Sequence, residues 1–152
     1  MDNSIILGGF IWAPAIKYKD EILEQLGQKY ELLNYKKYSF VSFDHLERVI
    51  VKLYENDDVS MDYISNYKIK RLREYKPECI NFFIKINNPK FSKAKHNNQM
   101  VINSIIKLKN KIRDKYKHEI SDYKRDIIIH ISDNQKQTNF VTDLLEKHIK
   151  KI

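Results

Sequence analysis

The sequence predicts an α+β sandwich in which helices pack on one face of a four-stranded, mainly antiparallel sheet. Short apolar segments alternate along the chain with longer segments whose apolar residues recur every three or four positions. The chain contains only 3 Gly and 3 Pro, which argues against a loop-built β-sandwich. Its 152 residues suffice for one ordinary core, so we expect a single domain over residues 1–152.

Four segments have the composition of strands. They are Ser4 to Trp12, which contains Gly8-Gly9, then Glu31 to Phe40, Cys79 to Ile86, and the isoleucine-rich run that ends near Ile131. The third is nearly all apolar, which is typical of a central strand buried on both faces. The second is rich in tyrosine, and we expect Leu33, Tyr35 and Tyr38 to point inward.

Helices are expected between these strands. Three of them have a residue able to cap the N-terminus, namely Asp20 for the first, Ser42 or Asp44 for the second, and Ser60 for the third. Glu47 is placed to complete a capping box with Asp44. A further helix runs from about Val101 to Tyr116, after a polar loop over Asn87 to Asn98, and a last one covers Gln135 to Ile149. This order predicts a ferredoxin-like sandwich, with a doubly wound sheet as the alternative.

Composition indicates a chain that works inside the cell. Cys79 is the only cysteine, so it has no partner for a disulfide or a zinc site and is expected to be a core thiol in a reducing compartment. The apolar N-terminal stretch lacks the basic residues that precede a signal sequence. No apolar run has the length of a membrane span, so we expect a cytoplasmic protein. The histidines are scattered, and we expect no dedicated metal site.

The stretch from Arg125 to Asn134 carries the strongest candidate site. Four isoleucines surround His130, and Ser132 and Asp133 follow it before a helix begins. A histidine at the end of a buried strand has its titration set by its neighbours, and a helix N-terminus nearby favours a phosphate. Catalysis at His130 is one interpretation. A hydrogen-bonded core histidine is the other.

Positive charge is concentrated between Cys79 and Lys117. This segment holds ten basic residues against the single acid Asp114, whereas the net charge of the whole chain is +8. Such a surface suits nucleotide phosphates, a polyanion or nucleic acid. A solvated helix face is the alternative interpretation.

The last forty residues resemble the nucleoside diphosphate kinase family. That family carries an Ile-Arg-Gly-Asp-Phe segment, then a Gly-Arg-Asn-Ile-Ile-His-Gly-Ser-Asp strand and a helix. This chain has Ile112-Arg113-Asp114-Lys115-Tyr116, followed by Lys124 to Asp133, which reads Lys-Arg-Asp-Ile-Ile-Ile-His-Ile-Ser-Asp. The expected order of strands and helices is also similar to that of the family.

The resemblance implies a phosphotransferase whose histidine takes a phosphoryl group from a nucleoside triphosphate with Mg²⁺ and passes it on. His130 would be the nucleophile, Ser132 and Asp133 would assist it, and Arg113 would bind phosphate. Further phosphate-binding candidates are Lys17, Lys111 and Arg125. A homo-oligomer is implied by resemblance alone.

The sequence departs from the family at several positions. The family's Lys-Pro-Asp after the first strand is replaced here by Trp12-Ala13-Pro14-Ala15, so its phosphate-binding lysine would be Lys17 or Lys19. Ile131 stands beside the histidine in place of glycine, and Val141 replaces a glutamate that contacts the imidazole. The resemblance therefore supports the fold more than the activity.

Two function classes follow. The first is a divergent phosphotransferase that acts through His130 on a nucleotide or another phosphate donor. The second is a binding module that uses the basic segment from Cys79 to Lys117 for a polyanion, RNA or protein partner. Convergence of His130, Ser132 and Arg113 with further cations would favour the first, and an open basic helix face would favour the second.

Overall fold

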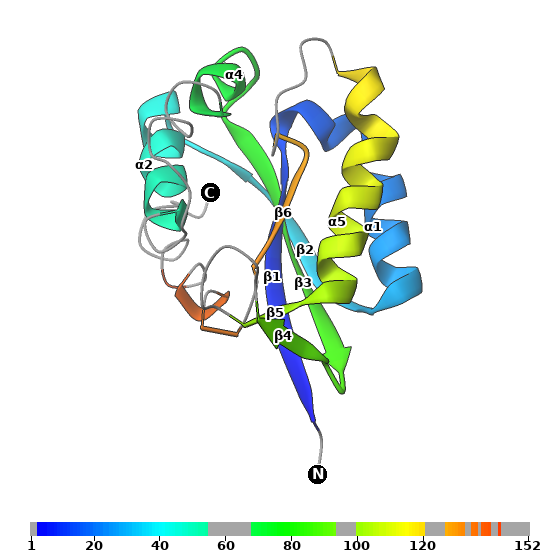
Figure 1. Cartoon of the computed structure of the whole chain (residues 1–152). Coiled ribbons are helices and arrows are strands. Elements are labelled where there is room, and N and C mark those ends of the chain that lie inside the picture. The colour runs from blue at the N-terminus through cyan, green and yellow to red at the C-terminus, as the bar shows by residue number, and fades with distance from the viewer. Residues whose placement is uncertain are drawn as a thin grey trace.

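The fold is built on a four-stranded antiparallel sheet in the order β2-β3-β1-β6 (Figure 1). The computed structural model describes residues 3–54, 68–93, 100–120, 127–132, 135–136, 138–140 and 143. The strands are β1 (Ser4–Trp12), β2 (Glu31–Ser39), β3 (Glu78–Asn87) and β6 (Ile129–Ile131). The predicted sheet and its ferredoxin-like arrangement are confirmed, with the apolar segment β3 in a central position as expected.

Two long helices form the layer that the sandwich predicts. α1 (Lys19–Lys29) follows the 3₁₀ helix η1 (Ala13–Tyr18), and α5 (Asn103–Tyr116) leads into η3 (Lys117–Glu119). The hydroxyl of Tyr30, just after α1, donates to Ser104 Oγ at 2.6 Å, and the Tyr18 ring stacks on Tyr116 with centroids 4.7 Å apart. The two helices therefore run antiparallel, side by side (Figure 1).

The spacing of apolar residues explains which faces these helices bury. The buried side chains fall three or four positions apart and form one stripe on each helix. They are Ile22, Leu23 and Leu26 on α1, and Ile105, Leu108, Ile112 and Tyr116 on α5. Asp20 lies in the first turn of α1, because the preceding 3₁₀ helix, which contains Pro14, leads directly into it.

The structure adds a second group of helices on the other side of the sheet. α2 (Phe43–Tyr54) and the short α4 (Lys70–Leu72) lie opposite α1 and α5 (Figure 1). The apolar residues that recur along α2 at three- and four-residue spacing are buried, namely Leu46, Val49, Ile50 and Leu53, and Phe43 is partly buried. The predicted helix start at Ser60 lies outside the described residues.

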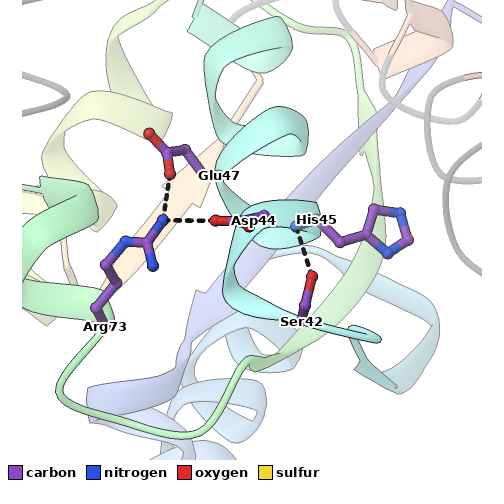
Figure 2. A network of polar contacts seen from close by, with 5 residues as sticks. All are labelled: Ser42, Asp44, His45, Glu47 and Arg73. Atoms are coloured by element: carbon purple, nitrogen blue, oxygen red, sulfur yellow. Dashed lines mark hydrogen bonds and ion pairs between the residues drawn. The ribbon is translucent and has the colours of Figure 1, made fainter.

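The capping of α2 differs in part from the prediction. Ser42 is the capping residue, because its Oγ accepts from the His45 backbone N–H at 3.2 Å. Glu47 does not close a box with Asp44. Both carboxylates instead bind Arg73, which donates to Asp44 at 3.0 Å and also contacts Glu47 (Figure 2). These contacts join α2 to the turn that follows α4.

Two further expectations are wrong. Within the segment predicted as a loop, β4 (Phe91–Lys93) pairs with β5 (Met100–Ile102), so Val101 belongs to a hairpin and not to the following helix. Leu33 and Tyr35 are exposed. Leu33 lies where the register of β2 against β3 shifts, between Leu32 and Asn34, whereas Tyr35 pairs regularly with Phe82 but belongs to the edge strand of the sheet. A bulge adds one residue to the strand, and the alternation of inward and outward side chains is interrupted there.

Gly9 is required where β1 approaches its neighbours. A Cβ atom at this position would overlap the Phe82 ring and the carbonyl oxygen of His130. A backbone oxygen cannot move without moving its strand, so the absence of a side chain on Gly9 lets β6 pair closely with β1. Gly27, in α1, has no atom within 4 Å of the corresponding position.

We therefore expect opposite effects of two glycine-to-alanine changes. Gly9→Ala should lower the free energy of unfolding by about 1–3 kcal/mol, because it forces overlap in the core. Gly27→Ala should leave it unchanged or raise it by up to about 1 kcal/mol, since alanine favours an exposed helix. Urea denaturation measures both. Equal stability of the Gly9→Ala variant and the natural protein would contradict the close approach.

Candidate active site

His130 lies on β6, the edge strand beside β1. The register pairs His130 with Phe10, and residues directly opposite in an antiparallel pair point to the same face of the sheet. Trp12 is two residues further along β1 and shares that face, where its ring stacks on Phe10 with centroids 5.1 Å apart. Lys68, just before α4, contacts the Trp12 ring, so this is the face that α4 covers.

Three hydrogen bonds fix the short strand that carries His130. The Trp12 N–H donates to the Ile128 carbonyl at 2.9 Å, and the Ser132 N–H donates to the Gly8 carbonyl at 2.9 Å. From the helical layer, Arg113 Nη2 donates to the Ile129 carbonyl at 2.9 Å. The Arg113 guanidinium is therefore held against Ile129, the residue that precedes His130.

The surroundings of His130 favour its neutral form. Burial lowers the pKa of His130 well below its ordinary value of 6.5, and the positive charges of Lys68, Lys109 and Arg113 lower it further. The side chain is only 8% exposed, so water screens these charges weakly. A neutral imidazole keeps a lone pair on one ring nitrogen, which is the form required for nucleophilic attack.

The structure brings some of the candidate residues together. Arg113 reaches β6 from α5 and acts electrostatically on His130. Lys111 is exposed on α5, and Lys17 is exposed with its Nζ 5.2 Å from the Tyr18 ring centroid. Neither is among the charges that lower the pKa of His130. Arg125 and Asp133 lie outside the described residues, so their roles stay predictions.

Ser132 contributes a buried hydroxyl close to the site. It follows His130 by two positions, it is 1% exposed, and its Oγ has no hydrogen-bond partner among the described residues. A buried hydroxyl without a partner costs free energy, which a ligand oxygen could offset by accepting its hydrogen bond. Its expected part in orienting His130 stays a prediction.

Two cations near His130 were missed from the sequence. Lys109 is one helical turn before Arg113, so the four-residue spacing places both on one flank of α5 and could have identified it. Lys68 had no such signal. It is far from His130 along the chain, and only the packing of the segment before α4 brings its charge to the site.

Among the described residues, the single cysteine does not compete with His130 as a nucleophile. Cys79 is buried as expected, and burial raises the pKa of its thiol, so it stays uncharged. Within the described ranges, no three His, Cys, Asp or Glu side chains are grouped to hold a metal ion. No helix in the described part of the chain is long and apolar enough to cross a membrane.

Solved structures with this architecture exist, although sequence comparison finds no relative. No protein-family model and no curated protein matches the sequence. The nucleoside diphosphate kinase of Aquifex aeolicus superposes with a TM-score of 0.55 at 9% identity, covering 97% of this chain and 99% of the enzyme. The chain shares the nucleoside diphosphate kinase fold. The enzyme of Borrelia burgdorferi was solved as a transition-state mimic with vanadate and ADP, and it superposes with a TM-score of 0.50 at 11% identity. This superposition covers 99% of this chain and 92% of the Borrelia enzyme.

The buried neutral state of His130 predicts a loss of stability in acid. The pKa of His130 is lower in the folded chain than in the unfolded one, so the unfolded state binds more protons as the pH falls below about 6.5. Stability should then fall by up to about 1.4 kcal/mol per pH unit from this group. Urea denaturation at about pH 7.5 and 5.5 should show a smaller difference in His130→Gln than in the natural protein.

His118 provides the control, because it is exposed. His118→Gln should keep the pH dependence of the natural protein. A pH dependence that is unaltered in His130→Gln would show that His130 is not held neutral by the fold.

Proposed function

We propose that the chain is a divergent phosphotransferase that accepts a phosphoryl group on His130 and passes it to a second substrate. One observation carries the proposal, namely that a buried, neutral histidine stands among the charges of Lys68, Lys109 and Arg113. Cations destabilise a protonated imidazole, but they stabilise the negative oxygens of a phosphoryl group in transfer. The same charges therefore favour the nucleophilic form of the histidine and the transition state.

The reaction has two in-line steps. The lone pair of a His130 ring nitrogen attacks the terminal phosphorus of the donor, a P–N bond forms, and the P–O bond to the leaving group breaks. The leaving oxygen keeps the electron pair of that bond. An acceptor oxygen then attacks the phosphorus of the adduct, and the P–N electrons return to the imidazole. The acceptor is a nucleoside diphosphate or another phosphorylated compound.

Magnesium would enter this site with the donor. The described groups that act on His130 are cationic and supply no carboxylate ligands. Mg²⁺ is commonly held by substrate phosphates and water with few protein ligands, so the donor's phosphate oxygens would hold it here. When bound there, it would neutralise part of the phosphate charge.

A nucleotide is the donor that we propose. The Borrelia enzyme was solved with ADP and vanadate, and the two chains superpose over nearly their full lengths. At 11% identity this likeness shows the fold alone. The choice of a nucleoside triphosphate therefore rests on the proposed chemistry and on the resemblance around His130.

A second candidate function is favoured by the outer flank of α5. Lys107, Lys111 and Lys115 are exposed and follow one another at four-residue intervals. Like charges at this spacing weaken a helix, and a bound polyanion would relieve their repulsion. This surface is the basis of the alternative, in which the chain binds a polyanion without chemistry at His130.

The first test is the formation of a phosphohistidine. Incubation with γ-labelled ATP and Mg²⁺ should give an acid-labile, base-stable adduct in the natural protein, and His130→Ala should reduce it to background because the nucleophile is gone. His118→Ala, an exposed histidine, should label normally. Folding of each variant is checked by circular dichroism.

The result distinguishes the two functions. A stoichiometric adduct that depends on His130 establishes the intermediate and leaves the acceptor to be found. No adduct from any nucleoside triphosphate in folded protein would overturn the transfer mechanism and favour polyanion binding on α5.

Arg113 should matter far more than its neighbour Lys111. Arg113→Met removes a cation that acts on His130, and it should slow adduct formation by about a hundredfold. Lys111→Met removes an exposed charge from the same helix and should have little effect. Rapid-quench measurement of labelling gives both rates. Similar rates for the two variants would place the phosphate away from Arg113.

A further inference from the structure

Lys68 is a charged residue in an unusual setting. Its side chain is fully buried, although it belongs to the short helical segment just before α4. Its Nζ lies 4.7 Å from the centroid of the Trp12 ring. An aromatic face attracts an ammonium group, and water screens a buried charge only weakly. A buried ammonium at such a place is well suited to bind an anion.

A continuous row of rings leads from Lys68 to His130. Trp12 stacks on Phe10, with centroids 5.1 Å apart and planes at 11°, and the Phe10 ring lies 6.4 Å from the His130 ring. All three rings project from the same face of β1 and β6. The charge of Lys68 acts on His130, and little water screens it because both side chains are buried.

The cations approach His130 from both layers of the fold. Lys109 and Arg113 belong to α5, from which Arg113 reaches the Ile129 carbonyl of β6, and Lys68 belongs to the segment before α4, on the other side of the sheet (Figure 1). A phosphoryl group carries negative oxygens on several sides, so cations placed on both sides can bind different oxygens. Lys17 and Lys19, the lysines that the sequence offered for this task, are not among the charges that act on His130.

We propose that Lys68 is a phosphate-binding residue of this site, with its ammonium donating to oxygens of the phosphoryl group presented to His130. The proposal rests on the proposed function for the location of the phosphate. It assigns the role to a lysine from the α4 side of the sheet, where the sequence had pointed to the end of the first strand.

Trp12 makes the proposal measurable, because it is the single tryptophan of the chain and Lys68 lies over its ring. Titration with inorganic pyrophosphate should change the emission of Trp12, and calorimetry gives the affinity. Lys68→Met should weaken binding by about tenfold or more, the usual effect of losing a charge-assisted hydrogen bond. Lys68→Arg should restore most of the affinity by keeping the charge.

Lys29→Met is the matched control, since it makes the same exchange at an exposed position on α1, away from the basic flank of α5. It should bind pyrophosphate as the natural protein does. Unchanged affinity in folded Lys68→Met would overturn the proposal, as would an absence of binding by the natural protein. Loss of folding in Lys68→Met together with weak binding by folded Lys68→Arg would also overturn it.

The outcome is separable from the test for a phosphohistidine. Pyrophosphate binding that depends on Lys68, without an adduct on His130, would keep the assignment of Lys68 and overturn the transfer mechanism. An adduct that forms while Lys68→Met binds pyrophosphate normally would do the reverse.

Discussion

The antiparallel pairing of β1 with β6 is the constraint on which the rest of the site depends. It sets His130 opposite Phe10, and so it decides which face of the sheet the imidazole occupies. A shift of one residue would turn His130 to the opposite face, toward α1 and α5. Backbone bonds on either side of His130 hold this register, and Gly9 lets the two strands come close enough to form it.

Burial and charge act in the same direction on His130. An apolar surround alone would make the histidine neutral, and so would nearby cations alone. Cations also have an effect that burial lacks, because they stabilise a negatively charged group bound next to the imidazole ring. A histidine kept only for packing gains nothing from the cations that act on it, since they oppose its protonation without improving its packing. The arrangement is therefore easier to explain by an anionic ligand than by the stability of the core.

The fold could be predicted from the sequence because its signals are local. Apolar spacing located α1, α2 and α5, and continuous apolar composition identified β3 as central. The errors arose where one residue changes the pattern. A bulge after Leu32 turned Leu33 outward, and short pairing of Phe91–Lys93 made a hairpin where composition indicated a loop. Alternation and composition do not encode either feature.

From the sequence, only the site residues on β6 and α5 could be predicted. His130 and Arg113 belong to the segments that carry the resemblance, and Lys109 follows from the helical period of α5. Lys68 reaches the site through tertiary packing alone, because it comes from a segment on the opposite side of the sheet from α5. At 9% identity to an enzyme of the same fold, the positions that supply charge need not be the same ones. What the chemistry requires is positive charge near the phosphorus, and any element that borders His130 can supply it.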